Sequence, residues 1–132
     1  MKSRLILVTM ILLAFAGTVS AHHGNASYDM TKSVTVKGTV TDFQLVNPHV
    51  LIYMDVKDES GKVVNWSIEF GSPNALLRRG LRKTDFPAGT EVVIEGFRAK
   101  NGTATLNGRS VKLPDGRNLF TGGSAPDEQP QP

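Results

Sequence analysis

Hydrophobic and polar residues alternate over much of the chain, with the period of two that is typical of half-buried β-strands. A polar lead-in, Gly24 to Lys32, precedes the first such segment. The apolar face of that segment consists of Val34, Val36, Gly38 and Val40. Phe43 has the opposite parity to Val40. We therefore predict a β-bulge near Thr41-Asp42, which would turn Phe43 inward and bend the strand as a closed barrel requires.

Two more strands are predicted next, joined by a short polar loop. The first covers His49–Lys57 and follows the turn signal Asn47-Pro48. The loop Asp58–Gly61 predicts a hairpin to the second strand, Val63–Phe70. Trp66 lies on the apolar face of that strand, so we expect it to pack in the core rather than stack on a ligand.

A short helix should follow these strands. Ser72 is a suitable N-cap, Pro73 suits the first helical position, and Gly80 suits the end of the last turn. Two further strands are predicted over Glu91–Arg98 and from about Thr103 to Leu113.

This order of elements predicts an all-β domain with one short helix. Three strands, a helix and two more strands match a five-stranded OB-like Greek-key barrel, which we place at residues 22–120. A small open β-sandwich is the alternative. Residues 121–132 are rich in Gly, Pro and polar residues and are predicted to form a disordered tail.

The first 21 residues have the features of a cleaved signal peptide. Lys2 and Arg4 give a positive start, residues 5–15 form an apolar run, and Val19-Ser20-Ala21 places small residues at the cleavage positions. The apolar run is too short to span a bilayer, which takes about 20 residues. We therefore expect a periplasmic or secreted protein with no retained membrane anchor. A cut after Ala16 is the alternative cleavage site.

Processing would change the charge of the protein. Cleavage after Ala21 leaves 132 − 21 = 111 residues, and the loss of Lys2 and Arg4 leaves 13 basic residues against 12 acidic ones. This near-neutral balance gives no support to nucleic-acid binding, although the pI of the full chain is about 9.4. The chain has no cysteine, which excludes disulfides, thiolate chemistry and lipid attachment through Cys.

Three histidines, His22, His23 and His49, are the main candidates for chemistry. After cleavage at Ala21, His22 would carry the free α-amino group, and its amine and Nδ1 could chelate one metal ion. A further imidazole would complete a T-shaped set of three nitrogens, a histidine brace, which favours Cu(II). His49 follows a turn and is the natural third ligand. His23 offers a competing mode through its imidazole, the amine and the intervening amide nitrogen.

Other interpretations of the same residues stay open. His22 and His23 can instead be a solvated chain start, and His49 a turn residue that hydrogen-bonds the local backbone. Glu69 lies on the polar face of its strand and is a candidate acid–base group or partner of a metal ligand; a solvated strand face is the alternative. Asn47 and Tyr28 are further candidates for lining the site.

Several motifs cover nearly the whole domain that would remain after processing. They are HHG…YD (His22, His23, Tyr28, Asp29), VKGTVTDFQ, NPH (Asn47, Pro48, His49), GKVVNWSIE, GSPNALLRRG, PAGTEVVIEG and RSVKLPDGR. With these motifs the chain resembles an uncharacterised family of small exported bacterial proteins, the DUF6152 type. It departs from the family at Leu45-Val46, where an aromatic usually precedes NPH, and at Leu81, where Trp is usual. The resemblance implies an exported, compact β domain and no assigned activity.

These observations predict a non-enzymatic binding or accessory protein of the periplasm. Its site would lie at the barrel end that holds the amino terminus and the NPH turn, with copper on His22 and His49 as the expected cofactor. The alternative is a metal-free interaction module that docks on another envelope protein. A copper-dependent redox enzyme is a third class, but no substrate surface is recognisable in the sequence. The expected partner is an envelope protein or a small ligand, and no motif supports hydrolytic catalysis.

Overall fold

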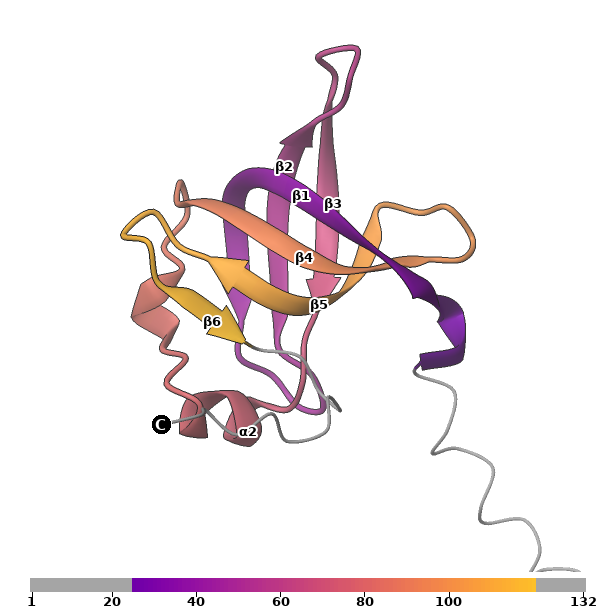
Figure 1. The fold of residues 1–132 in the computed structure, drawn as a ribbon. Helices are drawn as coiled ribbons and strands as arrows, with labels where there is room; N and C mark the ends of the chain where they lie inside the picture. The colour runs from indigo at the N-terminus through magenta and orange to yellow at the C-terminus, as the bar shows by residue number, and fades with distance from the viewer. Residues whose placement is uncertain (1–24, 121–132) are drawn as a thin grey trace, which may run out of the picture.

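A computed structural model of the protein describes residues 25–120. Six strands, one α-helix and two short 3₁₀ helices make up this part of the chain (Figure 1). In chain order the elements are η1 (Asn25–Ser27), β1 (Tyr28–Gln44), β2 (Leu51–Lys57), β3 (Val63–Glu69), α2 (Pro73–Arg78), η2 (Lys83–Asp85), β4 (Glu91–Ala99), β5 (Thr105–Lys112) and β6 (Asn118–Phe120).

The first five strands close into a barrel. β1 pairs antiparallel with both β2 and β4, β2 pairs with β3, and β4 pairs with β5. The barrel closes where residues 67–69 of β3 pair in parallel with residues 105–107 of β5. β6 pairs with β5 as one additional strand. The predicted OB-like Greek-key barrel is therefore confirmed.

β1 is longer than the sequence pattern indicates. Its register against β2 shifts between Val40 and Asp42, so the predicted bulge is confirmed, and Phe43 is buried. The prediction that residues 24–32 form a polar lead-in was wrong in part, because β1 begins at Tyr28, which pairs with Ala99 of β4. β1 pairs with β4 at Tyr28 and again from Ser33, with a register shift between them. Residues 29–32 bury no regular face, so alternation gives no signal there.

Apolar side chains from all five barrel strands fill the interior. Trp66 is partly buried against this core, as predicted. The rings of Phe43 and Phe86 stack with centroids 5.0 Å apart. The largest fully buried side chains are Val40, Val50, Ile52, Met54, Ile68, Leu76, Val92, Ile94, Leu106 and Val111.

Helix α2 lies at the lower end of the barrel in the view of Figure 1. Its predicted start is confirmed, because the Ser72 side chain accepts a hydrogen bond from the backbone N–H of Ala75 and Pro73 is the first helical residue. Gly80 follows the helix with φ of 91°, a left-handed conformation that glycine adopts without strain. Leu76 is 1% exposed, so the helix contributes to the core at this end.

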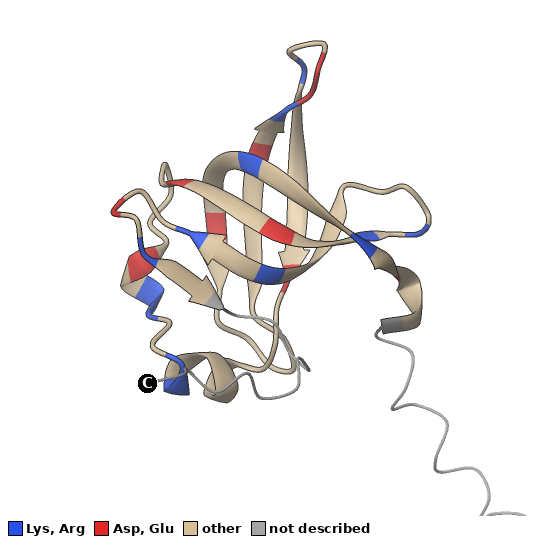
Figure 2. Ribbon diagram, in the orientation of Figure 1, with Lys and Arg blue, Asp and Glu red and all other residues tan. Residues whose placement is uncertain are grey.

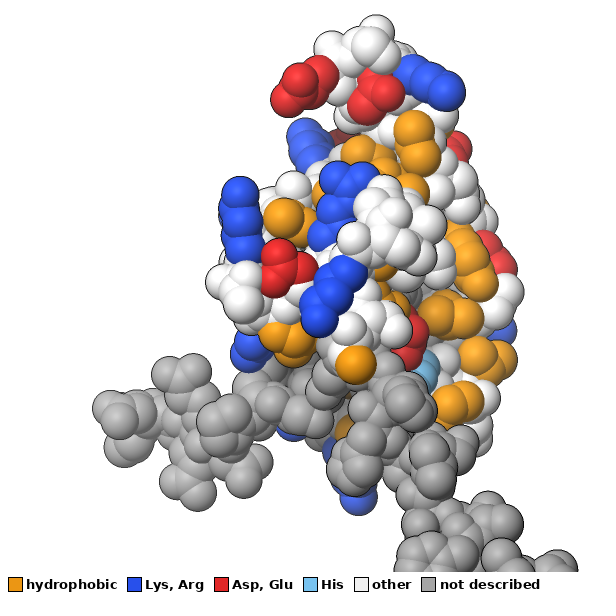
Figure 3. All heavy atoms as spheres, turned by 90° about the vertical axis from the view of Figure 1, so that its right-hand side faces the viewer, with side chains coloured by type: hydrophobic (Ala, Val, Ile, Leu, Met, Phe, Trp, Pro, Cys, Tyr) orange, Lys and Arg blue, Asp and Glu red, His pale blue; other side chains and the backbone are white. Residues whose placement is uncertain are grey.

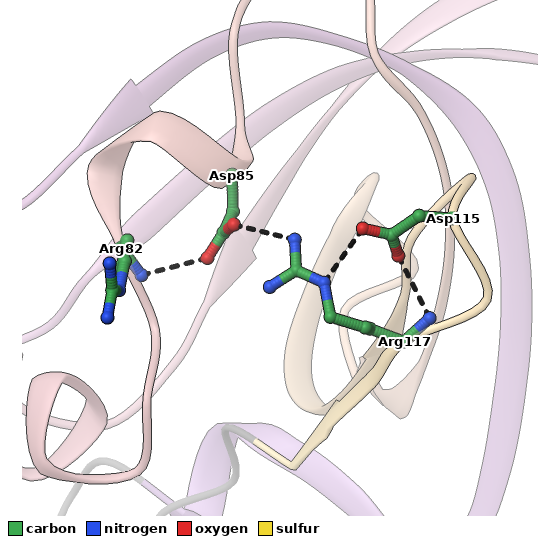
Figure 4. Close-up of polar contacts among 4 residues, drawn as sticks. All are labelled: Arg82, Asp85, Asp115 and Arg117. Carbon is green, nitrogen blue, oxygen red and sulfur yellow. Dashed lines mark hydrogen bonds and ion pairs between the residues drawn. The ribbon is translucent and has the colours of Figure 1, made fainter.

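Besides η1, the structure adds two elements that the pattern did not predict, η2 and β6. Arg117, in the turn between β5 and β6, joins them: its Nη2 lies 2.8 Å from Asp85 Oδ1 of η2 (Figure 4). Its Nε also lies 2.7 Å from Asp115 Oδ2 in the same turn. The Asp85 side chain is only 8% exposed, so this ion pair is partly shielded from solvent.

Charges of both signs are spread over the strands and hairpins (Figure 2). Within residues 25–120, no helix has the length and apolar character needed to cross a membrane.

Candidate functional site

His49 lies in the loop between β1 and β2, two residues before β2 begins. The prediction that β2 begins at His49 was wrong by two residues, since β2 begins at Leu51. Val50, next to His49, donates a backbone hydrogen bond to Gly71 O and accepts one from Phe70 N, at 3.0 Å and 2.9 Å. These two bonds bring the end of β3 alongside the loop. The loop also contains a cis peptide bond between Asn47 and Pro48.

The imidazole of His49 contacts the carboxylate of Glu69. His49 Nδ1 lies 2.7 Å from Glu69 Oε1, and the two side chains are 45% and 28% exposed. Within residues 25–120, Nε2 of His49 has no hydrogen bond or ion pair. One ring nitrogen is thus held by the barrel, and no group of residues 25–120 engages the other.

Tyr28 holds the same carboxylate from the other side. Its hydroxyl donates a hydrogen bond of 3.1 Å to Glu69 Oε2, and the residue is 7% exposed. Burial, together with the charge and the hydrogen bond of Glu69, raises the pKa of Tyr28 to about 12. Tyr28 therefore stays protonated, and a hydrogen-bond donor, throughout the physiological pH range.

The structure thus brings together three of the residues proposed from sequence: Tyr28, His49 and Glu69. They come from the start of β1, the loop before β2 and the end of β3. Asn47 is exposed in the same loop, and within the described chain it makes no side-chain hydrogen bond to these three residues. His22 and His23 lie outside the described residues, as does the proposed signal peptide.

Two half-buried residues on the barrel wall beside this site were not singled out from sequence. Leu51 of β2 pairs with Glu69 in the antiparallel register, and Asn107 of β5 pairs with Glu69 in the parallel register. Figure 3 shows the histidine beside an acidic side chain and next to a run of hydrophobic side chains. Leu51 could have been identified from its position in the alternation of β2. Asn107 could not, because the parallel pairing of β3 with β5 joins segments nearly 40 residues apart and gives no signal in a local sequence pattern.

The described barrel provides one histidine to any metal ion. Within residues 25–120, no group of three or more His, Asp or Glu side chains is arranged to hold a metal. A site on His49 would therefore need further ligands from elsewhere in the chain or from a partner. A fixed, half-exposed imidazole backed by a carboxylate can bind a metal ion or accept a proton from a ligand.

Comparison with known proteins identifies the family. The model of the family of unknown function DUF6152 matches residues 10–108, which is three quarters of the chain. No curated protein and no solved structure matches the chain. The match includes Tyr28, His49 and Glu69. The chain belongs to the DUF6152 family, a family of unknown function.

Proposed function

We propose that this protein is an exported, periplasmic binding or accessory protein that holds copper with its processed amino terminus and His49. The amine and Nδ1 of His22 would supply two nitrogens, and Nε2 of His49 the third. The proposal includes cleavage of residues 1–21 and no retained membrane anchor. The mixed surface charge in Figure 2 supports a partner other than nucleic acid, either an envelope protein or a small ligand.

One observation supports this site above the others: the contact of Tyr28 with Glu69. His22 precedes Tyr28 by 28 − 22 = 6 residues, and an extended chain of that length spans at most about 20 Å. The hydroxyl of Tyr28 lies 3.1 Å from the carboxylate that holds His49. A chain that begins at His22 would therefore be long enough to reach the His49 imidazole.

Copper is the metal that these ligands favour. Three nitrogens in a planar arrangement suit Cu(II), which also has the highest affinity among divalent first-row metals for such ligands. The chain has no cysteine that would favour a thiolate site. Because the amine must lose its proton to bind, affinity should rise with pH through its ordinary pKa of about 7.7–8.0.

Copper titration with electron paramagnetic resonance tests the proposal on four forms of the exported protein. These are the native start, a form with one added residue before His22, His49→Ala, and His23→Ala as the matched control. Intact-mass analysis first establishes where the exported chain begins. We expect one copper ion on the native form and on His23→Ala. The added residue and His49→Ala should each weaken binding by more than the ~10–100-fold effect of losing a metal ligand's hydrogen-bonded partner.

Three results would contradict the proposal. A chain that starts at Gly17 lacks the required amine on His22. Equal affinity of the native and extended forms would rule out ligation by the amine. Loss of binding in His23→Ala but not in His49→Ala would assign the copper to a chelate at the second position.

The second candidate is a metal-free interaction module of the cell envelope. The hydrophobic side chains beside the histidine in Figure 3 favour it, and Val46 in the same loop is 44% exposed. Exposed apolar residues near a rim of polar ones are typical of protein-binding surfaces. Capture of an envelope protein that persists in the presence of a chelator and is lost in Val46→Asp would favour this candidate.

A further inference from the structure

We propose that Glu69 and Tyr28 are positioning residues that fix His49 as its Nδ1–H tautomer and so present Nε2 to a transition-metal ion. The inference rests on the proposed function for the identity of the ligand, but not for the tautomer. It assigns distinct roles to two residues that are not themselves ligands. Glu69 determines which imidazole nitrogen of His49 carries the proton, and Tyr28 holds the Glu69 carboxylate in place.

The tautomer follows from the donors and acceptors in the contact. An ionised carboxylate has no proton to donate, so the 2.7 Å contact between Glu69 Oε1 and His49 Nδ1 requires the proton on Nδ1. In a neutral imidazole the other nitrogen, Nε2, then carries the lone pair. Free imidazole side chains in water favour the opposite tautomer, with the proton on Nε2. Glu69 thus reverses the default preference of His49.

Tyr28 restricts what the carboxylate can do. Its hydroxyl donates to Oε2, while His49 donates to Oε1, so each carboxylate oxygen has a donor. Tyr28 is 7% exposed, so bulk water could not replace its hydroxyl as the donor to Glu69 unless the surrounding side chains repacked. With both oxygens engaged, Glu69 is held as an acceptor for His49 and is not free to turn toward a metal ion.

The same arrangement orients the ring. His49 is nearly half exposed, and an exposed imidazole would otherwise lose rotational freedom when it binds a ligand. A hydrogen bond from Nδ1 to a carboxylate is the usual way in which proteins orient a metal-binding histidine and raise its basicity. The contacts on the barrel wall therefore prepare His49 for ligation through Nε2 before any ligand arrives.

Nitrogen NMR of the metal-free, ¹⁵N-labelled exported protein tests the tautomer directly. The spectra are recorded at a pH of about 8, above the value of about 6.5 at which a free imidazole side chain titrates. Long-range proton–nitrogen correlations distinguish the protonated nitrogen from the bare one, and His49→Ala identifies the signals. We expect Nδ1 to be protonated in the native protein. Glu69→Ala should shift His49 to the Nε2–H form, whereas Glu69→Gln, whose amide oxygen can still accept from Nδ1, should retain the native tautomer.

The second readout is copper affinity in the same variants. Glu69→Ala should lower copper affinity by about 10–100-fold, and Glu69→Gln should keep most of the native affinity. Glu59→Ala, an exposed residue in the β2–β3 hairpin, is the matched control for removing an acidic side chain. Dispersed backbone spectra establish that each variant is folded.

The outcomes separate this inference from the proposed function. An Nε2–H tautomer in the native protein, or an Nδ1–H tautomer retained in Glu69→Ala, would overturn the positioning role. Unchanged copper affinity in Glu69→Ala would overturn it as well. A fixed Nδ1–H tautomer in a native protein that binds no copper would support the positioning role and reject copper as the ligand.

Discussion

At the scale of single residues, the site depends on how Tyr28 combines burial with a polar contact. Its ring is covered by the barrel wall, and its hydroxyl needs a partner, which Glu69 provides. Burial and the nearby negative charge both disfavour the tyrosinate, which explains the raised pKa of Tyr28. The stability of the start of β1 therefore depends on whether the Tyr28 hydroxyl is protonated.

Tyr28→Phe should change how stability depends on alkaline pH. The folded pKa of Tyr28, about 12, lies above the ordinary value of 10.0, so its contribution is complete below pH 10 and is lost as the pH rises toward 12. The native protein should lose about 2 kcal/mol more than Tyr28→Phe over this range. Urea unfolding between pH 9 and pH 12 measures the difference, with Tyr53→Phe as the matched control. Parallel curves for the native protein and Tyr28→Phe would contradict the assignment.

At the scale of elements, short pieces of structure depend on side chains that join them. η2 has three residues and β6 has three, and neither length is stable by itself. Asp85 accepts a hydrogen bond from the Arg82 backbone N–H and pairs with Arg117 from the β5–β6 turn (Figure 4). One carboxylate therefore caps η2 and connects it to the hairpin.

Arg117→Ala should loosen this corner of the molecule. It leaves Asp85, whose side chain is 8% exposed, without its ion-pair partner, at a cost of about 1–2 kcal/mol in the free energy of unfolding. Lys112→Ala removes an exposed cation from β5 and is the matched control, with an expected change below ~0.5 kcal/mol. Urea unfolding compares the two, and hydrogen exchange of the β6 amides should accelerate in Arg117→Ala alone. Equal effects of the two variants would show that Asp85 does not need its partner.

At the scale of the whole molecule, closure of the barrel requires a glycine. Gly108 of β5 lies against Phe70, which follows β3: a Cβ atom at position 108 would lie 2.1 Å from Phe70 Cε1. That distance is far below van der Waals contact, so any side chain there would displace the ring. The closing strands approach each other because position 108 has no side chain.

Gly108→Ala should therefore destabilise the fold although alanine is small. Overpacking of a closed core costs typically about 1–3 kcal/mol, and we expect the upper part of that range in urea unfolding. Phe70→Leu in the same chain should relieve part of the strain, so the double variant should be more stable than the sum of the single effects implies. Additive effects would mean that the ring of Phe70 is not what excludes a side chain at position 108.

The fold and part of the site could be predicted because their signals are local. The bulge before Phe43 is visible as a change of parity, and the start of α2 as Ser72 followed by Pro73. Tyr28, His49 and Glu69 were each named from sequence, but their contact was not. The start of β1 and the strand β6 were missed because they are held by pairing with β4 and β5 rather than by a buried face of their own.

The amino-acid sequence by itself determined the alternation that makes the strands, the capping of the helix and the supply of just three imidazoles. These properties depend on residues that are neighbours along the chain. The tertiary structure alone decided that a tyrosine and a histidine, up to 41 positions away along the chain, both contact the carboxylate of one glutamate. That meeting depends on the closure of the barrel and on strand register, which are set by packing between distant segments and leave no trace in any short stretch of sequence.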